Sequence, residues 1–182
     1  MFSSSASRPH EPPMPAPLAY FLTWPTYGSW LPGDERGWVE YRHGWKLPDP
    51  IRKLEAAARM TEDACILDAE QRKLVERTIT EHCRIRGWEL YAVNCRTNHV
   101  HIVVSANRTP NLVRVQFKSW CTRRLKELEV ERLHRGRADD CNAATRENWW
   151  AERGGRRFIS DQKSLEAAIR YVLDGQDALD TH

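Results

Sequence analysis

NHVHIVV, residues 98–104, is the stretch of this sequence that decides the fold, because it alternates two histidines with β-branched residues. Side chains two positions apart on a strand point the same way and lie roughly 6–7 Å apart. His99 and His101 therefore share one face, and the β-branched residues at even positions fill the other. The pattern predicts a buried strand that presents two imidazoles, a pair suited to binding one cation.

A His-x-His pair also arises by chance, and many buried histidines serve only to fill a core. The neighbouring sequence lacks the additional Asp and His that zinc hydrolases carry, and it has no Cys-rich zinc pattern. The pair on its own therefore indicates a metal site without identifying the metal.

The segments around this strand carry helix and strand signals of their own. Apolar residues recur at three- and four-residue steps in the predicted helices and alternate in the predicted strands. The expected elements are a strand over 18–23, a helix over 68–86 with a cap at 61–63, strands over 88–93 and 99–104 joined by a short turn, a helix over 109–128, a bent strand or tight hairpin over 149–159, and a helix from 160 or 161 to about 175. This order predicts an α+β fold of the ferredoxin-like, split βαββαβ type: one antiparallel sheet with two helices on one face, followed by a C-terminal helix.

A single domain is expected over residues 18–182. Residues 1–17 form a Ser/Pro-rich tail without the apolar core of a signal peptide, and we expect this tail to be disordered. Residues 24–60 are rich in Trp, Gly and Pro without a period, which predicts a long ordered loop inserted into the domain. Residues 129–148 are polar and charged, and a second loop is expected there.

The overall composition excludes few classes of function. Lys and Arg total 28 against 25 Asp and Glu, so the net charge of +3 does not by itself indicate a polyanionic partner. Five cysteines are dispersed without a CxxC pair, which is typical of reduced, partly buried thiols and favours the cytoplasm. No apolar run approaches the length of a membrane span, so no membrane partner is expected.

Tyr171 on the final predicted helix is a candidate nucleophile. A tyrosine at this place is ordinarily a core residue, but a phenol can attack a phosphodiester when a metal ion polarises the phosphate. Two histidines would not saturate such an ion, so a third ligand is needed. Asp174 lies about 60° from Tyr171 around a helix, whereas Gln176 reaches the same side only if the helix bulges at Gly175. Both remain candidates.

Basic and aromatic residues gather in two segments that follow the histidine strand. Arginines beside aromatic rings suit single-stranded nucleic acid, whose bases stack and whose phosphates pair with cations. The alternatives are an ordinary solvated helix face and tryptophans that fill irregular loops. The candidate DNA-binding residues are Arg114, Lys118, Arg123 and Arg124 in the first segment, and Trp149, Trp150, Arg153, Arg156 and Arg157 in the second.

Taken together, these residues resemble the HUH-type single-tyrosine transposases of insertion sequences, including the REP-associated tyrosine transposases. The resemblance is carried by 98–104, by IRYV at 169–172, and by YFLTW and TYGSWLPGD at 20–24 and 26–34. It covers about residues 18–176. It implies a ferredoxin-like fold, recognition of hairpins in single-stranded DNA, and strand cutting and rejoining through a 5′-phosphotyrosine at Tyr171.

The resemblance further implies that His99 and His101 bind Mg²⁺ or Mn²⁺, and it leaves open whether the active unit is a monomer or a homodimer. Close family members place Gln or Asn four residues after the tyrosine, where this chain has Gly175 and then Gln176. The family comparison therefore favours Gln176 as third ligand and helical geometry favours Asp174. A domesticated protein that binds hairpin DNA with weakened or lost cleavage is the alternative function, and a relaxase or replication initiator fits less well because such proteins carry further domains.

Overall fold

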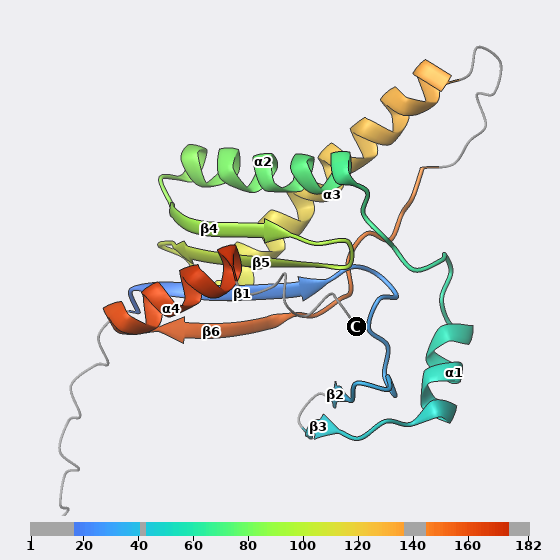
Figure 1. The fold of residues 1–182 in the computed structure, drawn as a ribbon. Coiled ribbons are helices and arrows are strands. Elements are labelled where there is room, and N and C mark those ends of the chain that lie inside the picture. Colours follow the sequence, from blue (N-terminus) through green and yellow to red (C-terminus); the bar gives the residue numbers. More distant parts are fainter. Residues whose placement is uncertain (1–16, 41–42, 137–144, 175–182) are drawn as a thin grey trace, which may run out of the picture.

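The computed structural model describes residues 17–40, 43–136 and 145–174. Its elements alternate between strands and helices along the chain (Figure 1). In order they are β1 (Ala19–Pro25), β2 (Trp38–Glu40), β3 (Gly44–Lys46), α1 (Pro50–Ala58), α2 (Ala69–Arg86), β4 (Glu89–Cys95), β5 (His99–Ser105), α3 (Pro110–Gly136), β6 (Gly155–Ile159) and α4 (Gln162–Leu173).

Four strands form one antiparallel sheet in the order β4-β5-β1-β6. The helix α2 connects β1 to β4 with β5 lying between these two strands, and α3 connects β5 to β6 with β1 lying between them. This is the split βαββαβ arrangement, and it confirms the α+β fold predicted from the sequence. The register places Thr23 opposite His101 and Pro25 opposite His99, so the histidines lie where β1 leaves the sheet.

One face of the sheet packs against α2 and α3 and holds the larger core. The even-numbered side chains of β5 point into it and meet Val75 and Ile79 of α2 and Val113 and Phe117 of α3, all fully buried. The rings of Trp24 and Phe117 stack there with centroids 6.4 Å apart. Burial of so many large apolar side chains gives this face most of the stabilising apolar contact of the domain.

Among the described residues, α4 is the helix that covers the opposite face of the sheet (Figure 1). Its core consists of smaller residues than the core beneath α2 and α3. The buried members are Ala19, Ala92, Val103, Ile159, Leu165, Ala168 and Val172. Because α4 is only 12 residues long, it leaves part of this face for the side chains of His99 and His101.

The segment 24–60 is not the long loop that the sequence predicted. It contains the β2-β3 hairpin and the helix α1. Asp49 caps α1 by accepting from the backbone N–H of Arg52, and Pro50 occupies its first turn. An acidic cap followed by Pro is an ordinary helix start, and the Gly- and Trp-rich sequence before it obscured that signal. We refer to residues 29–59 as the insertion, which stands beside the sheet in Figure 1.

Two further boundaries differ from expectation. The cap of α2 is Asp68, which forms a reciprocal capping box with Gln71, and residues 61–63 lie outside any helix. The helix α3 continues to Gly136, well into the predicted loop at 129–148. Arg132 explains the extension, since it bonds to Asp68 and Glu70 of α2 and so ties a polar helical end to the fold.

The cysteines and the membrane prediction can be compared directly with the structure. Cys65, Cys83, Cys95 and Cys121 are buried free thiols, whereas Cys141 lies outside the described residues. None of the helices in the described ranges combines the length and hydropathy that crossing a bilayer requires. The predicted N-terminal tail over residues 1–16 also lies outside the described part of the chain.

Candidate active site

The two histidines of β5 converge at the end of the sheet. Their ring centroids lie 4.6 Å apart at an interplanar angle of 86°. His101 is 8% exposed, whereas His99 is half-buried. Burial, together with the charges of His99 and Arg96, lowers the pKa of His101 to about 4. At neutral pH His101 is therefore a neutral imidazole, the form that can bind a cation.

Asn98 orients the first histidine. Its side-chain oxygen lies 2.6 Å from Nδ1 of His99, a distance at which Nδ1–H donates and Nε2 becomes the lone-pair nitrogen of that ring. The backbone oxygen of Asn98 accepts hydrogen bonds from the N–H of Thr26 and from the hydroxyls of Thr26 and Ser29. The turn before the histidine strand is thus held by the segment that follows β1.

Tyr171 reaches the histidines from α4 within the same chain. Its ring lies edge-on to His101, with centroids 5.8 Å apart, and edge-on to Phe21 of β1 at 5.9 Å. Phe21 also contacts His101 at 5.5 Å. Tyr171 is 43% exposed, so the tyrosine that ordinary packing would bury keeps access to solvent beside the metal-ligand candidates.

The end of α4 is fixed by a polar contact with the sheet. Asn94 of β4 pairs with His101 in register and donates its side-chain N–H to the backbone oxygen of Val172, 3.0 Å away. Val172 itself is fully buried. The residue that follows Tyr171 is therefore held both by a core contact and by a hydrogen bond, which limits how far the tyrosine can move from the histidines.

The two imidazoles fit a divalent cation as part of its ligand set. Nδ1 of His101 is buried, and no hydrogen-bonding partner reaches it from the described residues. An orphaned nitrogen on a neutral ring beside a second imidazole is the donor chemistry that Mn²⁺ or a related ion accepts.

A third His, Cys, Asp or Glu ligand is not found beside the two histidines among the described residues. Within these residues, no three His, Cys, Asp or Glu side chains group closely enough to hold a metal ion. Asp174 is the exposed C-cap residue of α4, and the structure does not bring it into a ligand group with His99 and His101, contrary to the expectation from helical geometry. Gln176 lies outside the described residues and stays a prediction.

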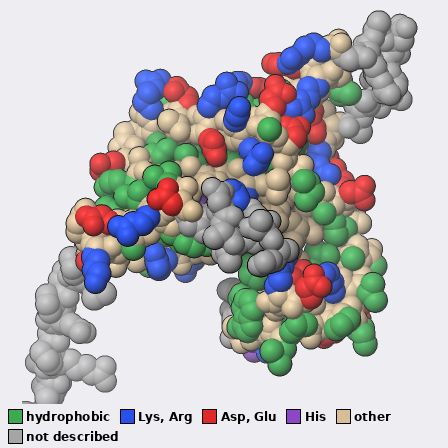
Figure 2. Space-filling view, viewed as in Figure 1, with side chains coloured by type: hydrophobic (Ala, Val, Ile, Leu, Met, Phe, Trp, Pro, Cys, Tyr) green, Lys and Arg blue, Asp and Glu red, His purple; other side chains and the backbone are tan. Residues whose placement is uncertain are grey.

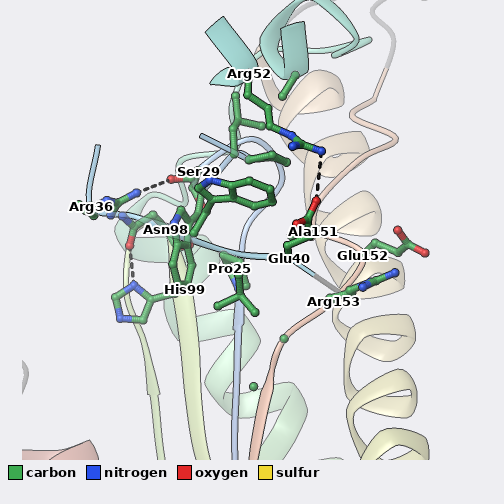
Figure 3. Close-up of a pocket in the computed structure, with 18 of the residues that line it drawn as sticks. Pro25, Ser29, Arg36, Glu40, Arg52, Asn98, His99, Ala151, Glu152 and Arg153 are labelled. Carbon is green, nitrogen blue, oxygen red and sulfur yellow. Dashed lines mark hydrogen bonds and ion pairs between the residues drawn. The ribbon is translucent and has the colours of Figure 1, made fainter. Parts of the chain in front are cut away.

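A groove of about 1480 Å³ opens from the histidine pair (Figure 3). One wall is the histidine end of the sheet with residues 151–155, and the other wall is the insertion. In Figure 3 Asn98 lies between His99 and Ser29, the first residue of the insertion, and Arg52 bonds to Glu40 across the upper part. The groove makes the histidines accessible to a ligand larger than a single small molecule.

Two of the predicted DNA-binding cations on α3 are engaged inside the protein. Lys118 donates to the backbone oxygens of residues 151, 152 and 153, at 2.7, 3.2 and 3.2 Å. Arg114 donates to the backbone oxygen of Gly154 at 2.8 Å. Burial, together with the charge of Arg114, lowers the pKa of Lys118 to about 8. Both side chains shape the 151–155 wall of the groove, and their contact with DNA stays a prediction.

The other predicted contacts on the α2 and α3 side are also engaged with the protein itself. Arg123 and Arg124 both bond to Glu127 on the surface of α3. Trp149 is 2% exposed and donates its N–H to the backbone oxygen of Arg146, so its ring cannot stack on a base. Trp150 packs edge-on against the core and donates to Thr122. Trp149 is a core residue, which corrects the prediction that it stacks on a base, whereas Trp150 is half-buried and its stacking stays a prediction.

The cations of β6 and its preceding segment divide between the two faces. Arg157 lies opposite Phe21 in register, with its guanidinium 5.5 Å from the Phe21 ring, and is exposed on the histidine face. Arg153 lines the groove. Arg156 points to the other face and bonds to Asn111 of α3. Arg157 and Arg153 are therefore the predicted cations that the structure places beside the histidine pair.

Phe21 and Asn94 belong to this site although sequence reasoning did not select them. Phe21 contacts His101, Tyr171 and Arg157, and Asn94 holds the end of α4. The only signal for Phe21 in the sequence was the alternation along β1. Alternation predicts which face of the strand a residue occupies, but it does not predict which residues pack against that face. Nothing local distinguishes Asn94 from any other strand asparagine.

One family model and two solved structures are similar to this chain. The family model described as IS200-like transposase matches residues 58–173, more than half of the chain. A REP-associated tyrosine transposase bound to a REP hairpin is 13% identical, with a TM-score of 0.42 and 93% of this chain and 70% of that chain covered. A candidate transposase from Deinococcus radiodurans R1 is 16% identical, with a TM-score of 0.42 and coverage of 95% and 98%.

The search of curated proteins gives no match. Membership is decided by the family model, because its matched residues include the histidine strand, the helix α3 and the helix that carries Tyr171. The chain belongs to the IS200-like transposase family.

Proposed function

We propose that this protein cuts and rejoins single-stranded DNA next to a hairpin, with Tyr171 as the nucleophile. The phenol oxygen attacks the scissile phosphorus as the bond from phosphorus to the 3′ oxygen breaks. The phenol loses its proton, and the leaving 3′ oxygen gains one. Attack by a second 3′-OH on the 5′-phosphotyrosine reverses these changes and rejoins the strand without an external energy source.

The observation that carries the proposal is the packing of Tyr171 against His101. The two residues are 70 positions apart, and α4 brings them to a centroid separation of 5.8 Å on the exposed end of the sheet. A tyrosine with only a packing role would have no reason to be 43% exposed beside a neutral buried histidine.

The remaining residues have distinct tasks around the phosphate. His99 and His101 would hold Mg²⁺ or Mn²⁺, with Gln176 as the third-ligand candidate. A bound divalent ion supplies polarisation of the phosphate and stabilisation of charge on the leaving oxygen. Asn98 and Asn94 position His99 and α4. Arg157, exposed beyond Phe21, is placed to pair with a phosphate of the bound strand.

One chain supplies both the histidines and the tyrosine of this site. A partner subunit is therefore not needed to complete the pair, and we propose that the monomer is the catalytic unit. Sedimentation of active protein at the concentrations used for cleavage tests this, since an obligatory dimer would contradict it.

The test is capture of the covalent intermediate. Purified protein is incubated with Mn²⁺ and labelled single-stranded DNA from its own flanking sequence, then run on a denaturing gel. A labelled protein band is expected, and Tyr171→Phe, His99→Ala or chelation of the metal should each remove it. Binding of the DNA without any covalent band in the wild type would instead support the alternative, a hairpin-binding protein that has lost cleavage.

A further inference from the structure

The insertion is built as a unit that leaves a large apolar surface uncovered. Asp34 is 5% exposed, accepts from Arg36 at 2.7 Å and pairs with Lys53 of α1 at 3.6 Å, which ties the loop before the hairpin to the helix. Glu40 of β2 pairs with Arg52 of α1, which ties the hairpin to the same helix. Yet apolar side chains of the same unit are exposed, and Figure 2 shows hydrophobic atoms gathered over this part of the molecule. The exposed residues are Trp30 (42%), Val39 (62%), Trp45 (59%), Leu47 (80%), Ile51 (72%) and Leu54 (71%).

Part of this apolar surface faces the histidine pair across the groove. Trp30, Val39 and Ile51 line the insertion side, and His99 and His101 line the other. The insertion is fixed at this distance by its start, because the Ser29 hydroxyl donates to the backbone oxygen of Asn98 at 3.0 Å. The apolar wall is therefore continuous with the catalytic site and rigidly placed beside it.

The ring of Trp30 is held in position. Its N–H donates to the backbone oxygen of Gly37 at 2.8 Å, where the backbone has a φ of 80° that side-chain-bearing residues rarely adopt. A Cβ at Gly37 would also lie 2.3 Å from the ring of Trp45, which in turn packs on Trp30 at 6.3 Å. A pinned, half-exposed aromatic ring loses little freedom when a flat partner stacks on it.

From these observations we propose that the groove binds the unpaired nucleotides next to the scissile phosphate, with Trp30 as a base-stacking platform. The inference rests on the proposed function, because it places the phosphate at the histidines. The DNA strand must then extend from the histidines into the groove, where the wall formed by the insertion is apolar. The volume of about 1480 Å³ exceeds that of an ordinary small-molecule pocket and suits a short polymer segment.

The charges of the groove indicate how the strand is held. Four arginines line it, namely Arg36, Arg52, Arg59 and Arg153, together with four carboxylates, namely Glu40, Asp49, Glu55 and Glu152. Arg52 pairs with Glu40 and Arg59 with Glu55. Because the lining is charge-balanced, stacking of bases rather than attraction of phosphates should provide the affinity of this part of the site, and its contribution should depend weakly on salt.

The experiment compares two oligonucleotides that differ only in their bases. Binding of the full chain to a 15-nucleotide oligothymidine and to an abasic strand of the same length is measured by fluorescence anisotropy. We expect the wild type to prefer the oligothymidine at least fivefold, the loss of one base–aromatic stack. Trp30→Ala should reduce the preference below twofold at low and high salt alike, and Trp30→Phe should retain most of it.

Two controls keep the outcome decisive. Trp120→Ala removes a tryptophan of nearly equal exposure, 40%, on α3 outside the groove, and it should leave the preference unchanged. Ile51→Glu places a carboxylate on the groove wall at a residue 72% exposed, so it should weaken oligothymidine binding without unfolding the insertion.

The proposal is overturned if neither Trp30→Ala nor Ile51→Glu changes the preference for bases. It is also overturned if these variants only convert a dimer to a monomer in sedimentation, because the apolar wall would then be a contact between copies of the chain. Failure of the proposed function is detected separately, because a wild-type protein that lacks cleavage forms no covalent band. Oligothymidine binding does not require cleavage, so it tests the groove independently.

Discussion

The two faces of the sheet have different structures although they share the same four strands. On β5 the even-numbered residues fill the core under α2 and α3, and the odd-numbered His99 and His101 face the side of α4. The first face is closed by two helices and large aromatic rings, whereas the second is covered by one short helix and keeps Tyr171 exposed. Under the proposed function, stability and chemistry are assigned to alternate residues of a single strand, so each can be perturbed without directly touching the other.

The largest expected effect comes from replacing, one at a time, two buried histidines that lie on opposite sides of the sheet. His101→Ala should lower formation of the covalent intermediate by at least about a thousandfold, because it removes a cation ligand beside the nucleophile. His82→Ala, on α2, removes an equally buried ring that bonds to Gln116, and should leave the intermediate intact in protein that remains folded. The amount of adduct formed by each variant is quantified on a gel. An equal loss of adduct in both variants would contradict the division of stability and chemistry between the two faces.

The next effect concerns the large core. Phe117 is fully buried and contacts the rings of Trp24, His82 and Trp88. Phe117→Ala should lower the free energy of unfolding by about 3–5 kcal/mol, with adduct formation preserved below the melting transition. Leu165→Ala, in the α4 core, should cost less stability, about 2 kcal/mol, but should slow adduct formation because α4 carries Tyr171. Denaturant titrations and adduct rates are measured on the same samples. Slower adduct formation in folded Phe117→Ala than in Leu165→Ala would contradict the separation of the two faces.

A smaller effect is expected for the aromatic ring between the histidine and the tyrosine. Phe21→Leu should slow adduct formation about tenfold, since it removes the surface against which His101 and Tyr171 are held, and should cost less than about 1.5 kcal/mol of stability. Tyr20→Leu is the matched control, because Tyr20 is the preceding residue of β1 and contacts Phe158 instead. An equal slowing in both variants would show that the strand as a whole, not the ring, matters.

The smallest effect is a pH dependence that originates on the large-core side. Burial lowers the pKa of His82 below its ordinary value of 6.5, and the charge of Arg86 adds to this, although the bond to Gln116 opposes it. The unfolded chain therefore binds a proton before the folded one does, so stability is full above about pH 6.5 and falls as the pH drops below it. In metal-free protein His101 acts in the same direction. His82→Gln should reduce the slope of unfolding free energy against pH between 6.5 and 5, and an unchanged slope would contradict the assignment.

Much of the fold could be predicted from the sequence, because its signals are local. The alternation in 98–104 fixes a two-faced strand, the apolar period places α2 over 68–86 although its cap was expected at 61–63, and Asp161 caps α4 as expected. Period and capping act within one or two turns of chain, so they can be read without knowing what lies nearby. At α1 the Gly- and Trp-rich sequence before Asp49 and Pro50 obscured the capping signal, and the prediction of a loop there was wrong.

The site depended on contacts that no local pattern contains. The sequence by itself determined which residues could do the chemistry: two histidines on one strand face and a late tyrosine on a helix. The tertiary structure decided that α4 crosses the face opposite to α2 and α3, which is what brings Tyr171 to His101. It also decided which cations are engaged internally, since Lys118 is bound by three backbone oxygens and Arg157 is exposed. A charge or a ring has the same appearance in sequence whether its partner is the protein, the solvent or DNA, and only long-range packing distinguishes these partners.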